Sequence, residues 1–185
     1  MDSPVFVFHK PRACVVTRSD ERGRRTVFDL LPAWVRDEGW QAVGRLDMDS
    51  RGLLLFVRDG ALQEQLSRPG LHDKVYEVWV RGRVTPAHIA ALLAGVGTSL
   101  GVMRAKAVEL KGGAGPKSRV LVTLNEGQNR QVRRMFGALE DPQTGKALKV
   151  TDLKRTALGP LQLDVASGAW RWLTPAECDA LGISA

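Results

Sequence analysis

The residues best suited to chemistry lie in one short polar stretch in the first third of the chain. Arg45, Asp47 and Asp49 stand between Gly44 and the apolar run Leu53–Val57. Loops at the ends of buried strands often carry functional groups, because the sheet beneath them is rigid. A carboxylate in such a loop could act in acid–base or nucleophilic catalysis, or it could bind a cation.

The neighbouring residues separate some of these possibilities. Asp47, Asp49 and Gly52 are spaced like the start of a calcium loop, but the fifth and twelfth positions are Arg51 and Arg58. An arginine at the twelfth position, where a bidentate glutamate should bind, excludes calcium. A hydrolase with Asp47 and Asp49 as acid and base stays open. The spacing supports it only weakly, because two carboxylates two positions apart in a loop need not point the same way. A surface turn with solvated acids also stays open.

A second polar stretch, from Asn125 to Phe136, places three arginines on a predicted helix. Apolar residues recur there at i, i+3, i+4 and i+7, as on one buried helix face: Val132, Met135, Phe136 and Leu139. At about 100° per residue, Arg130 and Arg134 point away from this face and Arg133 lies on its flank. Arg133 is therefore best placed to reach a partly buried carboxylate, whereas the other two face solvent or phosphate.

Charge is the most informative part of the composition. Lys and Arg number 27 against 20 Asp and Glu, which gives a net charge of +7. An excess of this size favours a polyanionic partner, most commonly nucleic acid, although a basic surface can also serve solubility alone. Cations are dense between residues 10 and 25: Lys10, Arg12, Arg18, Arg22, Arg24 and Arg25. Because no long run of like charges occurs, we expect the binding surface to be folded.

Cysteine usage and hydropathy exclude other classes of protein. Cys14 and Cys178 lie far apart and show no spacing typical of a metal site, so we expect reduced thiols and no metal. No apolar run approaches the length of a membrane span, and the first residues do not resemble a signal peptide. These features predict a cytoplasmic protein that does not enter a membrane.

Local patterns predict interspersed strands and helices. Strands are expected at Val5–Phe8, Leu53–Val57, Lys74–Arg81, Val102–Leu110 and Arg119–Asn125, the last two flanking a turn at Gly112–Pro116. Helices are expected at Thr26–Leu31, at Gly60–Ser67, from Thr85 to Gly95, and after the capping box that begins at Thr174. Since strands and helices do not alternate regularly, we expect an α+β fold with a mixed, largely antiparallel central sheet flanked by helices.

Taken together, these stretches resemble ribosomal pseudouridine synthases of the RsuA/RluB/RluE/RluF type. Three motifs recur in order: Gly44–Asp47 with Asp49-Ser50 and Gly52–Leu55; Lys74–Tyr76; and Glu126-Gly127 with Asn129–Phe136. Softer matches are Lys10-Pro11, Gly159–Leu161 and Gly168–Leu173. The resemblance runs from about Val5 to Leu173, nearly the whole chain.

The resemblance implies the pseudouridine synthase catalytic fold, which is two-lobed with a central cleft. We expect one catalytic domain over residues 1–185, with an N-terminal lobe of about 1–60 and a C-terminal lobe of about 61–185. The small N-terminal RNA-binding module of many relatives is missing, so the chain is similar to the short members that modify large-subunit ribosomal RNA.

The resemblance also implies roles for individual residues. Asp47 is the catalytic carboxylate, which either attacks the sugar or removes its 2′ proton, and Arg133 pairs with it and keeps it ionised. Tyr76 stacks on the target base and helps to remove the proton from carbon 5. Arg45 fills the gap left when the uridine flips out. No cofactor is expected.

We expect the RNA to be held mainly by cations around this site: Lys10, Arg24, Arg25, Arg45, Lys74, Arg130 and Arg134. The implied partner is ribosomal RNA or a pre-ribosomal particle, and a monomer is expected. The alternatives are a catalytically silent RNA-binding or ribosome-assembly protein on the same fold, and a synthase that acts on small-subunit ribosomal RNA or tRNA.

Three features depart from the family pattern. Arg51 stands where an acid is common, Gln128 stands where arginine is common, and residues 140–146 form a small insertion after the arginine-bearing helix. None of them touches Asp47, Tyr76 or Arg133, so we expect them to alter which RNA is held.

Overall fold

Two apolar runs form the centre of the first part of the fold. β1 (Val5–Lys10) is buried along its whole length and pairs antiparallel with β3 (Arg51–Val57) on one side and β11 (Trp170–Trp172) on the other. β2 (Gln41–Val43) also pairs with β3, and β10 (Leu161–Gln162) pairs with the end of β9 (Lys149–Leu158). Continuous apolar runs of this kind are expected where both faces of a sheet are covered.

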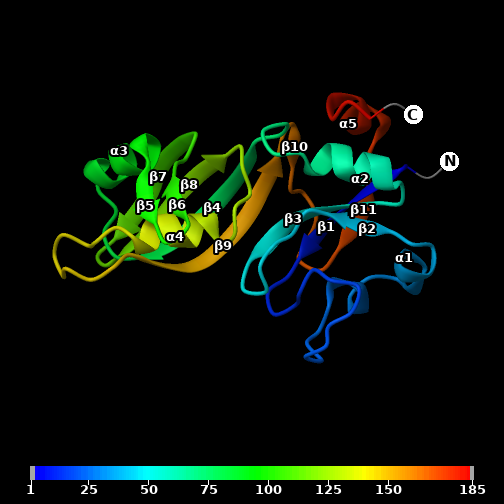
Figure 1. The fold of residues 1–185 in the computed structure, drawn as a ribbon, viewed down its shortest axis with the longest axis horizontal. Helices are drawn as coiled ribbons and strands as arrows, with labels where there is room; N and C mark the ends of the chain where they lie inside the picture. The colour runs from blue at the N-terminus through cyan, green and yellow to red at the C-terminus, as the bar shows by residue number, and fades with distance from the viewer. Residues whose placement is uncertain (1–2, 184–185) are drawn as a thin grey trace. The chain divides into compact units, whose positions relative to one another are not determined.

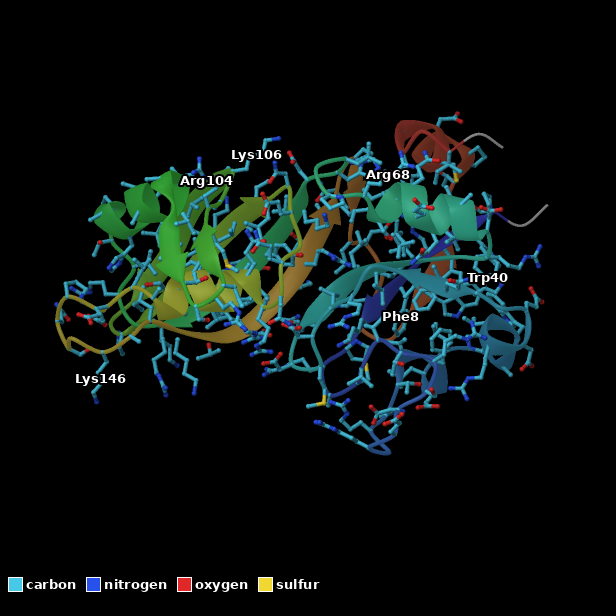
Figure 2. All side chains as sticks on the ribbon, in the orientation of Figure 1. Phe8, Trp40, Arg68, Arg104, Lys106 and Lys146 are labelled. Carbon is cyan, nitrogen blue, oxygen red and sulfur yellow. The ribbon has the colours of Figure 1, made fainter. Side chains whose placement is uncertain are left out.

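Side chains of β1 and β3 alternate between two separate cores. Val5 and Leu53 face a core that includes residues of α2 (Gly60–Ser67) and α5 (Pro175–Ala180). Phe6 and Phe56 face the second core, which includes residues of the short 3-10 helix η1 (Val27–Asp29) and of α1 (Ala33–Asp37). The second core is strongly aromatic, and Phe6 stacks on Phe56 with ring centroids 4.9 Å apart. Figure 1 shows α2 and α5 on one side of these strands and α1 on the other, and Figure 2 marks Phe8 and Trp40 in the aromatic core.

The computed structural model describes residues 3–183 and divides them into two units. Unit 1 contains the elements just described, that is, residues up to 72 and from 155 onward, and unit 2 contains residues 73–154. The boundary differs from the lobes expected at about 1–60 and 61–185. The reason is the pairing of β11 with β1, which returns the end of the chain to the N-terminal strand.

Unit 2 has its own set of paired strands and its own helices. β4 (Lys74–Arg81) pairs antiparallel with β8 (Lys117–Leu124), and β8 pairs with β7 (Ala107–Ala114). The first part of β9, up to Lys154, lies on the other side of β4. The remaining elements are α3 (Pro86–Ala94), the hairpin of β5 (Val96–Thr98) and β6 (Gly101–Met103), and α4 (Gln131–Gly137).

Most of the predicted elements are confirmed. The helices at Gly60–Ser67 and after Thr85, and the strand Lys74–Arg81, have the expected bounds. The strand expected at Val102–Leu110 is instead two strands, β6 and β7, and β7 continues through the glycines as far as Ala114. The helix expected at Thr26–Leu31 is only the three-residue η1. Within residues 3–183, no helix is long and apolar enough to cross a membrane.

Candidate active site

Asp47 lies in the loop that connects β2 to β3. The loop begins at Gly44, whose φ of +68° favours glycine, and closes with a turn in which Ser50 N donates to Asp47 O at 3.0 Å. Leu46 is buried beneath the loop, whereas Arg45 is exposed and Asp47 is half-buried. The loop therefore has one apolar anchor, Leu46, and exposes Arg45.

The buried side chain of Lys10 holds this loop in place. This side chain is fully buried, and Nζ donates to three backbone carbonyls: Asp47 at 3.0 Å, Ser50 at 2.8 Å and Pro11 at 3.0 Å. Three acceptors match the three protons of an ammonium group, so its donors are satisfied. The expectation that Lys10 contacts RNA is therefore wrong, because its charge is used inside the protein to fix both ends of the Asp47 turn.

The electrostatics of the Lys10 pocket reflect its depth. Burial lowers the pKa of Lys10, and the nearby Cys14, Asp47 and Asp49 oppose that shift. Burial also raises the pKa of the Cys14 thiol, which keeps it protonated and unreactive at neutral pH. The expected reduced thiol at Cys14 agrees with its free, buried state.

Gly52 fixes the other end of the loop, at the start of β3. Its φ is +120°, and a Cβ at this position would collide with the backbone of Arg155 on β9. Arg155 is buried, and its Nε donates to the carbonyl of Leu53 at 2.7 Å. No local sequence pattern indicates this role of Arg155, because it depends on a strand that lies about a hundred residues further along the chain.

Asp20 holds part of the basic segment before η1. Arg24 donates to Asp20 through its backbone N, Nε and NH2, and this arrangement lowers the pKa of Asp20 to about 2. The carboxylate of Asp20 neutralises the charge of Arg24, so Arg24 is less suited to bind a phosphate. Arg25 is exposed, and its carbonyl accepts a hydrogen bond from Val15 N. Arg25 is therefore the better placed of the two to contact RNA.

In unit 2, β4 carries Tyr76 near its beginning. Tyr76 is 8% exposed and shares a buried face with Val78 and Val80, as the alternation in the sequence predicts. Val122 lies opposite Tyr76 on β8, and Lys74 is half-buried at the first position of β4. Tyr76 is the only tyrosine of the chain, and its predicted role at the target base stays a prediction.

The three arginines at the start of α4 and within it are exposed or half-buried as the helix geometry predicts, but the contacts of Arg134 differ from expectation. Arg130 is exposed and precedes the helix in a left-handed conformation, with φ +49°. Arg133 is half-buried, and its NH1 donates to Val150 O at 3.2 Å. Arg134 differs from expectation, because it donates to Asn129 O, Asn129 Oδ1 and Ser99 Oγ. Its guanidinium stabilises the entrance to the helix and offers less to a phosphate.

The features that depart from the family pattern range from exposed to buried. Gln128 donates to Glu126 at 2.7 Å, and Arg51 is half-buried at the start of β3. The insertion at residues 140–146 is ordered by Asp141, whose carboxylate accepts from Arg83 N at 3.0 Å and from Gln143 N at 2.8 Å. Figure 2 marks the exposed Lys146 in this insertion.

The predicted site residues thus fall into two groups. Unit 1 holds Asp47 and Arg45 on the loop fixed by Lys10, together with Arg24 and Arg25; unit 2 holds Tyr76, Lys74, Arg133, Arg130 and Arg134. The pairing of Asp47 with Arg133 stays a prediction. Among residues 3–183, no group of three or more His, Cys, Asp or Glu side chains could hold a metal ion.

Comparison with known proteins gives one family and several relatives. A family model described as RNA pseudouridylate synthase matches residues 4–138. The chain is 38% identical over 180 residues to ribosomal large subunit pseudouridine synthase B of Escherichia coli (strain K12), a match that covers 96% of this chain and 59% of the relative. It is also 38% identical over 169 residues to the protein of the same name from Vibrio cholerae, covering 90% of this chain and 50% of the relative.

Solved structures show the same fold. A crystal structure of a pseudouridylate synthase matches with a TM-score of 0.81 and 28% identity, covering 98% of this chain and 75% of that one. Human RNA pseudouridylate synthase domain containing 4 matches with a TM-score of 0.61 at 14% identity. The expected α+β fold is therefore confirmed. The chain spans between a half and three-fifths of the length of these two curated relatives.

Proposed function

The chain belongs to the RNA pseudouridylate synthase family, and on that premise we propose that it isomerises a uridine of ribosomal RNA to pseudouridine. The observation that carries the proposal is the position of the family match, residues 4–138. This range contains Asp47 on its fixed loop, Tyr76 on β4 and Arg133 on α4.

The reaction needs few groups from the protein. The bond between the ribose and nitrogen 1 breaks, the base turns, and a bond from the ribose to carbon 5 forms. Carbon 5 then loses its proton to solvent and nitrogen 1 takes up a proton from solvent, so that the product has the same composition as the substrate and no electron is transferred. In the proposed mechanism Asp47 supplies the carboxylate, either as nucleophile at the sugar or as the base that removes the 2′ proton.

The other residues position the reacting groups and assist the reaction. In the proposed mechanism Arg133 pairs with Asp47, since a cation beside a carboxylate stabilises its negative charge. Tyr76 stacks on the base and assists the loss of the carbon-5 proton, and Arg45 fills the gap that the flipped uridine leaves. The exposed position of Arg45 on the same loop as Asp47 supports this assignment.

The names of the relatives support a more specific substrate. Both of the curated relatives described above are named for the large ribosomal subunit, and we propose large-subunit ribosomal RNA as the substrate, either free or in a pre-ribosomal particle. We further propose that the protein acts as a monomer in the cytoplasm, where such particles assemble.

The experiment that tests the proposal compares two neighbouring carboxylates. We expect Asp47→Asn to abolish tritium release from ribosomal RNA that carries 5-tritiated uridine, because an amide of nearly the same shape is neither base nor nucleophile. Asp49→Asn is the matched control on the same loop and should lose much less activity.

Three results would count against the proposal. Substantial turnover by Asp47→Asn would refute the catalytic role of this residue. Equal losses in the two variants would favour a paired-carboxylate mechanism. RNA binding by a wild-type protein that releases no tritium would identify a silent RNA-binding protein.

A further inference from the structure

The two faces of β4 differ in their chemistry. Tyr76, Val78 and Val80 are buried on one face. Because side chains alternate across a strand, Trp79 and Arg81 project from the opposite face. Trp79 is half-buried and Arg81 is exposed. Arg81 and Tyr76 therefore lie on opposite faces of the sheet, so a ligand of Arg81 would bind the face that does not carry Tyr76.

Three cations lie side by side across this opposite face. Arg81 is directly opposite Lys117 on β8. On the other side of β4, the side chain of Leu148 fills the space beside Gly82, and Thr151 Oγ1 donates to Trp79 O at 3.2 Å. These two contacts place Lys149 of β9 beside Arg81 of β4. Lys117, Arg81 and Lys149, named here the cation row, are all exposed.

The cation row carries an unusual concentration of charge. Neighbouring strands lie about 4.8 Å apart, so the three residues project from within roughly 10 Å. Like charges directly opposite each other on neighbouring strands destabilise a sheet. Within residues 3–183, no carboxylate forms an ion pair with any member of the row. An anion bound from solvent would relieve this repulsion.

The next residues along the face provide a fixed border for the row. Arg119 lies opposite Trp79, and its guanidinium lies over the indole ring at 5.9 Å from the centroid. Arg119 also forms an ion pair with Glu77, which is 9% exposed. The nearest acid on this face of β4 is thus already paired, and it leaves the charge of the row intact.

We propose that the cation row is a second RNA-docking surface, which binds backbone phosphates of the ribosomal RNA at a distance from the reacting uridine. The inference rests on the proposed function for the identity of the RNA. Charge complementarity supports it, since closely spaced cations beside an aromatic side chain match a phosphate backbone. Contacts of this kind position the RNA and perform no chemistry.

The test neutralises the row and measures RNA binding as a function of salt. We expect the triple variant Arg81→Gln/Lys117→Gln/Lys149→Gln to bind in vitro transcribed large-subunit ribosomal RNA at least tenfold more weakly at 0.1 M salt. The slope of log affinity against log salt should fall by about three units. Turnover at saturating RNA should stay at the wild-type value. The melting temperature should be unchanged or higher, because mutual repulsion is removed.

A control variant removes the same net charge elsewhere. Arg68→Gln/Lys106→Gln/Lys111→Gln changes three other cations, of which Lys106 pairs with Asp73 and Lys111 with Glu109. The proposal requires this control to retain a larger salt slope than the cation-row variant. Equal slopes in the two variants, or a wild-type slope in the cation-row variant, would overturn it.

The binding assay does not depend on catalysis. A wild-type protein that bound the RNA through the row but made no pseudouridine would contradict the proposed function and leave the docking surface standing. Normal pseudouridine formation together with an unchanged salt slope in the cation-row variant would support the proposed function and contradict the docking surface.

Discussion

The loop with Asp47 and the helix with Arg133 become ordered in opposite ways. The loop has no regular secondary structure, and the buried ammonium of Lys10 holds it by binding the carbonyls of Asp47 and Ser50. The helix α4 is held by its own apolar face, in which Met135 and Phe136 are almost completely buried. A loop with a single apolar anchor thus also depends on a polar side chain that is distant in the sequence, whereas a helix needs only its amphipathic pattern.

This difference separates residues that position the site from residues that act in it. Lys10 holds the loop through backbone carbonyls, so its loss should move Asp47 without removing any reacting group. Arg133 presents a charged group from a helix whose apolar face is buried, so its loss should remove function and leave the fold. The predictions below test that division, beginning with the largest expected effect.

Arg133 and Arg134 are neighbours with different partners and provide the sharpest contrast. We expect Arg133→Ala to lower turnover by about 100- to 1,000-fold with a small change in RNA affinity, because a charge that stabilises the reacting groups is lost. Arg134→Ala should lower turnover only a few-fold, since its partners are Asn129 and Ser99. Single-turnover rates at saturating RNA measure both effects, and similar losses in the two variants would contradict the assignment.

Lys10→Met breaks the arrangement that is specific to the loop. The variant keeps the length of the side chain but leaves three carbonyls without their donor, which should lower the free energy of unfolding by about 2–4 kcal/mol. Turnover of the folded protein should fall about 100-fold, because small displacements of a catalytic group are costly. Urea unfolding and tritium release measure the two effects. Wild-type turnover in the folded variant would show that Asp47 does not depend on Lys10.

Met135→Ala breaks the arrangement that is specific to the helix. The cavity left under α4 should also cost about 2–4 kcal/mol of stability. Here we expect turnover at low temperature, where the variant is still folded, to fall less than tenfold. Two variants with matched stability losses and different turnover would confirm that the loop and the helix play distinct parts. A 100-fold loss of turnover in Met135→Ala would remove the distinction.

Arg171 offers a surface counterpart of the Lys10 arrangement and the smallest expected effect. It forms ion pairs with Asp164 and Glu177, and its hydrogen bonds lower the pKa of Glu177 to about 2 from an ordinary value of 4.5. The stability from this pair is therefore complete above about pH 4.5 and is lost as the pH falls towards 2.

Arg171→Gln should cost about 1–2 kcal/mol at pH 7, after allowance for solvent screening, and much less at pH 2.5. Urea unfolding at the two pH values measures the difference. An equal loss at both would show that packing, and not charge, accounts for the contribution of Arg171.

The sequence predicts those parts of the molecule that depend on local patterns. The caps at Thr85 and Thr174 and the alternation of Tyr76, Val78 and Val80 are local signals, and the structure matches them. The basic segment that begins at Lys10 predicts an exposed side chain, whereas the burial of Lys10 depends on carbonyls that lie 37 and 40 residues further along the chain. No local pattern indicates the role of Arg155 either, since its close approach to Gly52 is created by tertiary structure.

The most direct test of the account is to map pseudouridine in ribosomal RNA from cells that lack this protein. Carbodiimide labelling followed by primer extension should show one large-subunit site that is lost in these cells. The wild-type gene should restore that site, and the gene encoding Asp47→Asn should not. An unchanged pattern of pseudouridine in ribosomal RNA, or full restoration by Asp47→Asn, would contradict the central claim that this chain modifies ribosomal RNA through Asp47.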